Sequence, residues 1–196
     1  MPIDVDEINL INAAKKDPME FGKLYEIYIT RIYNYIYFRV GDAHDAEDIT
    51  ARVFFKALKS ISSYKHMGLP FSAWLYRIAH NLVANHHRDH SRLKEISLES
   101  IPDPILPQKH EHPEITMQKT DEANLLLALI SDLPPVRQEL ISLKFMDKLS
   151  NAEIGKILRK SEGAVKSLYH RTLLELREKI REELPDLEED QLNTVM

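Results

Sequence analysis

The 196-residue sequence contains no cysteine and only five glycines. Without cysteine the protein forms neither disulfide bonds nor metal sites that need thiolate ligands. Low glycine content, combined with many Leu, Ile, Ala, Glu and Lys residues, favours helices throughout the chain. The length and the 43% of hydrophobic residues suffice for one medium domain or two small ones. The sequence therefore predicts an all-α protein.

Long hydrophobic runs are also missing. The longest uninterrupted apolar run covers residues 125–130, which is far too short to cross a bilayer. The first residues are acidic and lack the basic region that begins a signal peptide. We therefore expect a soluble, cytoplasmic protein, an assignment that the lack of cysteine also favours.

Prolines gather in one stretch of the chain, and they are Pro102, Pro104, Pro107 and Pro113. Because proline lacks a backbone donor and disfavours helix in the residue before it, this stretch predicts a flexible linker. The linker separates two small helical domains, and an acidic tail follows the second. The expected ranges are 1–95 for the first domain, 96–120 for the linker, 121–184 for the second domain and 185–196 for the tail.

The net charge of −5 is unfavourable for a protein that binds nucleic acid, but the charges are unevenly distributed. Basic residues outnumber acidic ones in 21–92 and again in 156–181, whereas acidic residues dominate in 1–20, 93–120 and 185–196. Two separate basic surfaces are thus available for phosphate groups.

The first domain has the pattern of consecutive helices. Apolar residues in 21–36 recur at intervals of three and four, which is typical of one helix face. Gly41-Asp42 interrupts this pattern, and a second helix is expected over 45–58, with acidic residues in its first turn. The segment 62–70 contains a glycine and a proline, so it predicts a loop before a further helix over 71–88.

The second domain contains a helix–turn–helix pattern. Ser150 and Glu153 form a capping-box signature before a short helix, and Ser161 is placed to cap a longer helix over 162–184. This arrangement is the one that places a helix in the major groove of DNA. Its polar face, able to reach bases and phosphates, consists of Lys166, Ser167, His170 and Arg171. The alternative is an ordinary helical hairpin with a solvated polar face.

Aromatic and basic residues are interspersed between positions 60 and 92. Such surfaces bind single-stranded nucleic acid, with bases stacked on aromatic rings and phosphates paired with cations. The residues of this kind are Tyr64, Lys65, His66, Phe71, Trp74, Tyr76, Arg77, Asn81, Arg88 and Arg92. The alternative is that the aromatic residues fill the core, and we prefer it for Trp74, which lies in an apolar stripe. For Tyr64, in the predicted loop, we favour the nucleic-acid contact.

Three histidines, His86, His87 and His90, lie close together in the sequence. His86 and His90 have a spacing that can chelate zinc, but no thiolate and no other part of a metalloprotease motif accompanies them. Our interpretation is a solvated or phosphate-facing role, with no metal and no cofactor. The sequence also lacks a glycine-rich phosphate loop and a nucleophile elbow, so we expect no enzymatic activity.

Two segments resemble a known family, the extracytoplasmic-function (ECF) sigma factors. Region 2 of that family resembles the segment containing DAEDITARVFFKAL at 45–58 and FSAWLYRIAHNLVANHHR at 71–88. Region 4 resembles LPPVRQELISLKFMDKLSNAEIGKILRKSEGAVKSLYHRTLLELREKI at 133–180. The two segments follow the family's order, with the proline-rich linker between them. The resemblance implies a factor that binds core RNA polymerase and directs initiation at specific promoters.

The resemblance also implies a role for each part. The helix over 45–58 would dock on the clamp helices of the polymerase large subunit through Asp45, Glu47, Asp48, Ile49, Arg52 and Phe55. The minus-ten element, once melted, would be read by Tyr64, Lys65, His66, Phe71, Arg77, Asn81, Asn85 and Arg88. The double-stranded minus-thirty-five element would be read by Ser161, Lys166, Ser167, His170 and Arg171. The implied partners are core RNA polymerase (clamp helices and flap), promoter DNA and an anti-sigma factor, with no small-molecule substrate.

Two other classes of function compete with this one. A stand-alone helix–turn–helix regulator would carry a sensor or dimerisation domain at its N-terminus. A sensor domain needs an apolar pocket with a few polar groups, whereas this first domain offers aromatic and basic residues and a polar helix. A nucleic-acid hydrolase would need a set of catalytic residues, and the sequence contains no convincing set.

Overall fold

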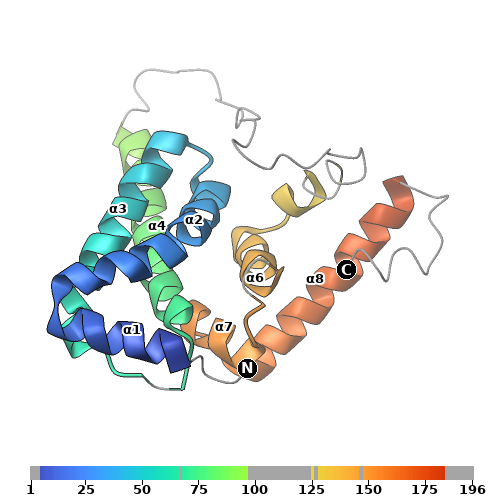
Figure 1. Ribbon diagram of the computed structural model, residues 1–196. Helices are drawn as coiled ribbons and strands as arrows, with labels where there is room; N and C mark the ends of the chain where they lie inside the picture. Colours follow the sequence, from blue (N-terminus) through green and yellow to red (C-terminus); the bar gives the residue numbers. More distant parts are fainter. Residues whose placement is uncertain (1–4, 67, 97–124, 126–127, 146–147, 184–196) are drawn as a thin grey trace. The chain divides into compact units, whose positions relative to one another are not determined.

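The computed structural model describes residues 5–66, 68–96, 125, 128–145 and 148–183. Every regular element within these ranges is a helix, which confirms the predicted all-α class (Figure 1). The chain divides into two compact units whose main parts are residues 1–110 and 111–196. Most of the predicted linker and all of the predicted tail lie outside the described residues. Among the described helices, none combines the length and the apolar composition that a membrane crossing requires.

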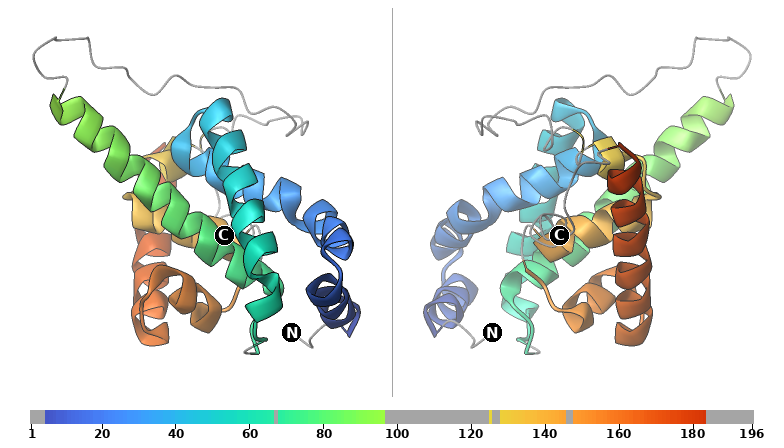
Figure 2. Two further views of the ribbon diagram at one scale, coloured as in Figure 1. Left: turned by 90° about the vertical axis from the view of Figure 1, so that its left-hand side faces the viewer. Right: turned by 90° about the vertical axis from the view of Figure 1, so that its right-hand side faces the viewer.

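The first unit is a helical bundle (Figure 1). Its elements are α1 (Val5–Lys16), η1 (Pro18–Glu20), α2 (Phe21–Val40), α3 (Ala43–Ser60), η2 (Ile61–Ser63) and α4 (Phe71–Ile96), where η marks a 3-10 turn. The helices α2, α3 and α4 pack against one another, and α1 packs against α2. The last turns of α4, the longest of these helices, extend beyond its neighbours (Figure 2).

Apolar residues at helical spacing form the core of this bundle. The fully buried large side chains are Leu24, Ile32, Tyr35, Ile36, Ile49, Phe71, Leu75 and Tyr76. The rings of Tyr35 and Tyr76 meet edge to face, with their centroids 4.9 Å apart. Burying one large apolar side chain contributes about 1.5–3 kcal/mol, so this core holds α3 and α4 firmly in place. The core packing therefore fixes the orientation of the outward faces of α3 and α4.

The predicted break between α2 and α3 is confirmed at Gly41-Asp42. Gly41 ends α2 in the left-handed conformation, with φ 74°, and its N–H donates to the Tyr37 carbonyl oxygen at 2.9 Å. The carboxylate of Asp42 accepts from the Asp45 N–H at 3.0 Å and so caps α3. The helix begins at Ala43, two residues earlier than the sequence pattern suggested.

The second unit contains a helical stretch at 128–131 followed by α6 (Pro135–Phe145), α7 (Asn151–Leu158) and α8 (Glu162–Glu183). Its core cluster consists of Leu129, Leu133, Ile141, Leu176 and Ile180. Arg137 of α6 forms an ion pair with Glu175 of α8 beside this cluster. The helix α8 is thereby held along one side by α6, and its opposite side faces outward.

Candidate nucleic-acid interface

The outward side of α3 carries four of the six residues predicted to bind the polymerase. Glu47, Asp48, Arg52 and Phe55 are exposed, and we call them the docking face. Arg52 Nη1 lies 3.6 Å from Asp48 Oδ2, an exposed ion pair of the kind that adds little stability. Phe55 is 67% exposed, and the partly exposed Leu58 lies one turn further along. Aromatic residues are enriched where protein partners meet, so the docking face suits a protein partner.

The other two residues of that prediction lie on a different side of α3. Ile49 is buried in the core, so in this structure it offers no surface for the predicted partner contact. Asp45, four residues earlier and hence on the same side, is only partly exposed. Its Oδ2 lies 3.4 Å from Nε2 of His86 on α4. The first turn of α3 is thus turned toward α4 on this side.

Tyr64, Phe71 and Trp74 form an aromatic cluster where the loop enters α4. The Tyr64 ring centroid lies 4.8 Å from that of Trp74 and 5.3 Å from that of Phe71. Phe71 is 0% exposed and Tyr64 is 9% exposed, whereas Trp74 is only partly buried. The ammonium of Lys15 on α1 lies 5.6 Å from the centre of the Tyr64 ring. Burial raises the pKa of the Tyr64 hydroxyl to about 12.

This cluster corrects the sequence interpretation of the aromatic residues. Phe71 is fully buried and offers no surface on which a base could stack, so in this structure it belongs to the core. Tyr64 is predicted to be exposed, but its side chain is buried. Trp74 is predicted to lie in the core, but its side chain is partly exposed to solvent. The loop position of Tyr64 does not make it exposed, because η2 packs against α1 and Lys15 of α1 lies over the Tyr64 ring. Tyr64 must leave the cluster before a base can stack on it.

The polar side of α4 carries the other residues of α4 that are predicted to contact melted DNA. Arg77, Asn81, Asn85 and Arg88 recur at intervals of three and four, so they share one side of the helix, and we call them the α4 stripe. Asn81 Nδ2 donates to the Arg77 carbonyl oxygen at 2.8 Å, and Arg88 Nη2 donates to Asn85 Oδ1 at 3.1 Å. Guanidinium and amide groups in a row match the phosphates and base edges of a single strand.

Lys65 and His66 lie in the loop before α4. The side chain of Lys65 is exposed, and that of His66 is partly buried. Both ring nitrogens of His66 are shielded from solvent, and neither has a hydrogen-bond partner among the residues that the structure describes. A shielded polar group without a partner costs about 1–3 kcal/mol. His66 therefore has hydrogen-bonding capacity that is not used among the described residues.

The turn between α7 and α8 has the geometry that the sequence predicted. The Ser150 N–H donates to Glu153 Oε2 at 2.6 Å, and the Glu153 N–H donates to Ser150 Oγ at 3.3 Å, which completes the capping box. After α7 the Lys160 N–H donates to the Gly155 carbonyl oxygen at 2.9 Å. Ser161 Oγ accepts from the Ala164 N–H at 3.2 Å and caps α8. These bonds set the angle at which α8 leaves the turn.

The N-terminal half of α8 presents the polar side chains predicted to read duplex DNA. Lys166, Ser167, His170 and Arg171 are exposed, and we call them the recognition face. The residues that face inward along α8 are Val165, Thr172, Leu176 and Ile180. Arg171 Nε lies 3.4 Å from the Ser167 carbonyl oxygen, which leaves most of its guanidinium donors unengaged on their own helix. The arrangement fits a helix that inserts into the major groove, and the contacts themselves stay a prediction.

Comparison with protein families gives two matches. Sigma-70 region 2 matches residues 24–93, and Sigma-70, region 4 matches residues 123–176. The chain is 36% identical over 153 residues to the ECF RNA polymerase sigma factor BldN of Streptomyces coelicolor, covering 78% of this chain and 57% of BldN. It is 33% identical over 187 residues to the ECF RNA polymerase sigma factor SigW of Bacillus subtilis, covering 89% of this chain and 94% of SigW.

Solved structures with a similar fold include two complexes. One is the sigma factor RpoE with the anti-sigma factor NepR from Bartonella quintana, with a TM-score of 0.68 and 20% identity over 83% of this chain and 97% of RpoE. The other is CnrH with the cytosolic domain of CnrY, with a TM-score of 0.62 and 20% identity over 90% of this chain and 97% of CnrH. At this identity the likeness concerns the fold.

Proposed function

The chain belongs to the ECF RNA polymerase sigma factors, and from this premise we propose that it binds core RNA polymerase and directs initiation at specific promoters. The observation that carries the proposal is the placement of its polar surfaces. The α4 stripe lies within the region 2 match, and the recognition face lies within the region 4 match. In this function the chain is a cytoplasmic DNA-binding protein that supplies no catalytic group of its own.

In this proposal the first unit binds the polymerase and melts the minus-ten element of the promoter. The docking face on α3 contacts the clamp helices of the polymerase large subunit, with Phe55 as its apolar centre. The α4 stripe and the loop residues Lys65 and His66 hold the single strand of the minus-ten element. Extruding a base from the duplex costs a few kcal/mol, and stacking on an aromatic ring contributes about 1–3 kcal/mol per base. Partly exposed Trp74 offers such a ring without rearrangement.

The second unit reads duplex DNA in this proposal. The recognition face enters the major groove at the minus-thirty-five element, where Lys166 and Arg171 provide positive charge for phosphates and guanine edges. The resemblance also implies that this unit contacts the polymerase flap. An anti-sigma factor, which the RpoE structure contains as NepR, would here cover the docking face, the recognition face or both.

Reversing the charge of the docking face tests the polymerase contact. We expect Glu47→Lys with Asp48→Lys to raise the Kd for core polymerase about tenfold, which corresponds to ~1.4 kcal/mol. The physical reason is that both carboxylates are exposed and able to pair with a partner's basic groups. The measurement is equilibrium binding of labelled chain to core polymerase at physiological salt.

The control for this variant is Glu26→Lys, which reverses one acidic charge, against two in the docking-face variant, at an exposed position of a different helix, α2. It should leave the Kd near the wild-type value. If the docking-face variant bound core polymerase as tightly as wild type, Glu47 and Asp48 would have no role in docking. Their remaining function would be to stabilise the N-terminus of α3.

Replacing Arg171 with alanine tests the recognition face. If its guanidinium bonds a guanine, the variant loses about 1–3 kcal/mol of discrimination at one promoter position. If it pairs with a phosphate, all sequences weaken alike, and the slope of log affinity against log salt falls by about one. We would measure binding of the polymerase complex to a series of promoter duplexes at several salt concentrations.

Arg181→Ala is the matched control, because Arg181 is exposed on the same helix and about 15 Å further along its axis. Binding of Arg171→Ala that matches wild type in affinity, preference and salt slope would show that α8 presents only a solvated face.

Run-off transcription tests the function as a whole. Core polymerase alone should give no promoter-specific transcript, and adding this chain should produce one. A stand-alone regulator would instead shift promoter duplexes without polymerase and would leave transcription by core polymerase non-specific. This second result would overturn the sigma-factor function.

A further inference from the structure

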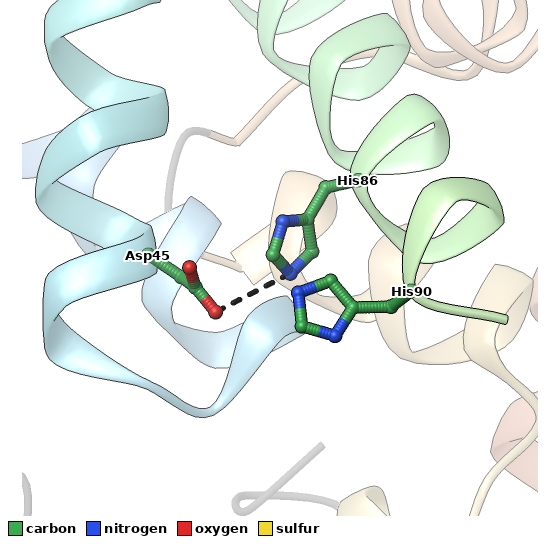
Figure 3. Close-up of side chains that lie close together, drawn as sticks. All are labelled: Asp45, His86 and His90. Carbon is green, nitrogen blue, oxygen red and sulfur yellow. Dashed lines mark ion pairs between the residues drawn. The ribbon is translucent and has the colours of Figure 1, made fainter. Parts of the chain in front are cut away.

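Three side chains with metal-binding chemistry converge where the first turn of α3 meets the C-terminal half of α4 (Figure 3). They are Asp45, His86 and His90, each of which offers one ligand atom within 4.8 Å of the other two. Asp45 Oδ2 and His86 Nε2 are 3.4 Å apart, and the rings of His86 and His90 have centroids 4.3 Å apart. Docking and DNA reading, as proposed above, make no use of either histidine.

The helices hold these groups together for simple geometric reasons. His86 and His90 are four residues apart, so they lie one turn above the other on the same side of α4. Asp45 follows the cap at Asp42 and projects from the side of α3 that packs against α4. Figure 3 shows the carboxylate pointing toward both imidazole rings from the opposite helix. The sequence interpretation rejected a metal because no thiolate and no other part of a metalloprotease motif accompanies the two histidines. The fold brings the Asp45 carboxylate to them as a third group.

The geometry and exposure of the cluster fit a divalent transition-metal ion. Zinc–ligand bonds of about 2.0–2.1 Å in a tetrahedron put neighbouring ligand atoms roughly 3.3 Å apart. The separation of Asp45 Oδ2 and His86 Nε2 is close to that value, and His90, which is exposed, can complete the set by side-chain rotation. The side chains of His86 and Asp45 are 15% and 40% exposed, so an ion has access from solvent.

We propose that Asp45, His86 and His90 bind a divalent transition-metal ion of the zinc type, which joins α3 to α4. Imidazole nitrogen is a preferred ligand of zinc, copper and nickel, and one carboxylate lowers the net charge of the complex. Three protein ligands leave a fourth position for water, as in open zinc sites. The ion would fix the first turn of α3, the helix that carries the docking face. Metal binding itself does not depend on the proposed role in transcription.

An ion pair alone is the competing explanation of the cluster. Asp45 Oδ2 and His86 Nε2 lie 3.4 Å apart and can hold each other without a metal, through a hydrogen bond or an ion pair. That contact does not involve His90, whose ligand atom nevertheless lies within 4.8 Å of the other two. The two explanations differ in one measurable respect, which is whether zinc binds and stabilises the chain.

The test uses the full chain without a polyhistidine tag, titrated with ZnCl₂ at neutral pH by calorimetry. We expect one equivalent to bind, and CoCl₂ in its place to give the visible absorption bands of a four-coordinate cobalt site. At zinc concentrations a hundredfold above Kd, Tm of the first unit should rise by about 10 °C. His86→Ala and His90→Ala should each lower the zinc affinity at least tenfold and, at the same zinc concentration, reduce this rise to about half or less.

His44→Ala is the matched control, because His44 is an exposed histidine next to Asp45 in α3 and lies outside the cluster. Its zinc affinity should equal that of wild type. His90 is exposed, so His90→Ala should fold normally, and the Tm of the metal-free variant verifies this. Failure of wild type to bind zinc, or undiminished binding by both His86→Ala and His90→Ala, would overturn the proposal.

Discussion

Replacing Phe71 with alanine should lower the free energy of unfolding of the first unit by about 3–5 kcal/mol. Phe71 is fully buried and its ring contacts those of Tyr28, Tyr64 and Trp74. Truncation removes this buried surface and leaves a cavity that the surrounding helices fill only in part. The loss is a large fraction of the stability of a small domain, which totals about 5–15 kcal/mol.

The protein offers its own probe for this measurement. Trp74 is the one tryptophan in the sequence, and its ring centroid lies 5.3 Å from that of Phe71. Its fluorescence during urea unfolding therefore reports on the first unit, and the shift of the midpoint gives the change in free energy. A change below 1 kcal/mol would contradict the assignment of Phe71 to the core and would reopen a contact with DNA.

Phe55→Ala is the matched control, since it removes the same side chain from an exposed position of the same unit. The free energy of unfolding should change by at most about 0.5 kcal/mol, as at most surface positions. The affinity for core polymerase should nevertheless fall, because Phe55 is the apolar centre of the docking face. The two variants thus separate stability from docking.

Replacing Gly155 with alanine should destabilise the second unit by about 1–3 kcal/mol and weaken binding to the minus-thirty-five duplex. A Cβ atom at this position would lie 2.7 Å from the carbonyl oxygen of Lys160, a backbone atom of the turn before α8. The same turn is closed by the bond from the Lys160 N–H to the Gly155 carbonyl oxygen. Relief of the clash must open this turn and change the direction of α8.

Gly163→Ala is the control for this second variant. A Cβ atom at Gly163 meets nothing within 4 Å, and alanine is the better helix former by about 1 kcal/mol in a helix interior. Its thermal midpoint, followed by circular dichroism, should equal or exceed that of wild type. Trp74 fluorescence should be unchanged in both variants because Trp74 belongs to the first unit. If Gly155→Ala were as stable as Gly163→Ala, the short distance between position 155 and the Lys160 carbonyl oxygen would not require glycine there.

Features that depend on neighbouring residues were predictable from the sequence. The capping box of Ser150 and Glu153, the cap at Ser161 and the break at Gly41-Asp42 all form as predicted. Each rests on hydrogen bonds or backbone angles within a few residues, so its signal is local. The exposed recognition face follows from the same logic, because helical spacing alone separates it from the inward residues of α8.

Side-chain environments that depend on a second helix were decided by the tertiary structure. Tyr64 follows η2 in an irregular segment, yet it is buried because the chain folds back onto α1 and α4. Ile49 belongs to the core, while Phe55, a larger apolar residue on the same helix, does not. Helical periodicity fixes which residues share a side, but the packing of α2 and α4 against α3 selects the side that is covered. The meeting of Asp45 with His86 and His90 has the same cause, since only the contact between α3 and α4 brings a carboxylate to two imidazoles that are distant in sequence.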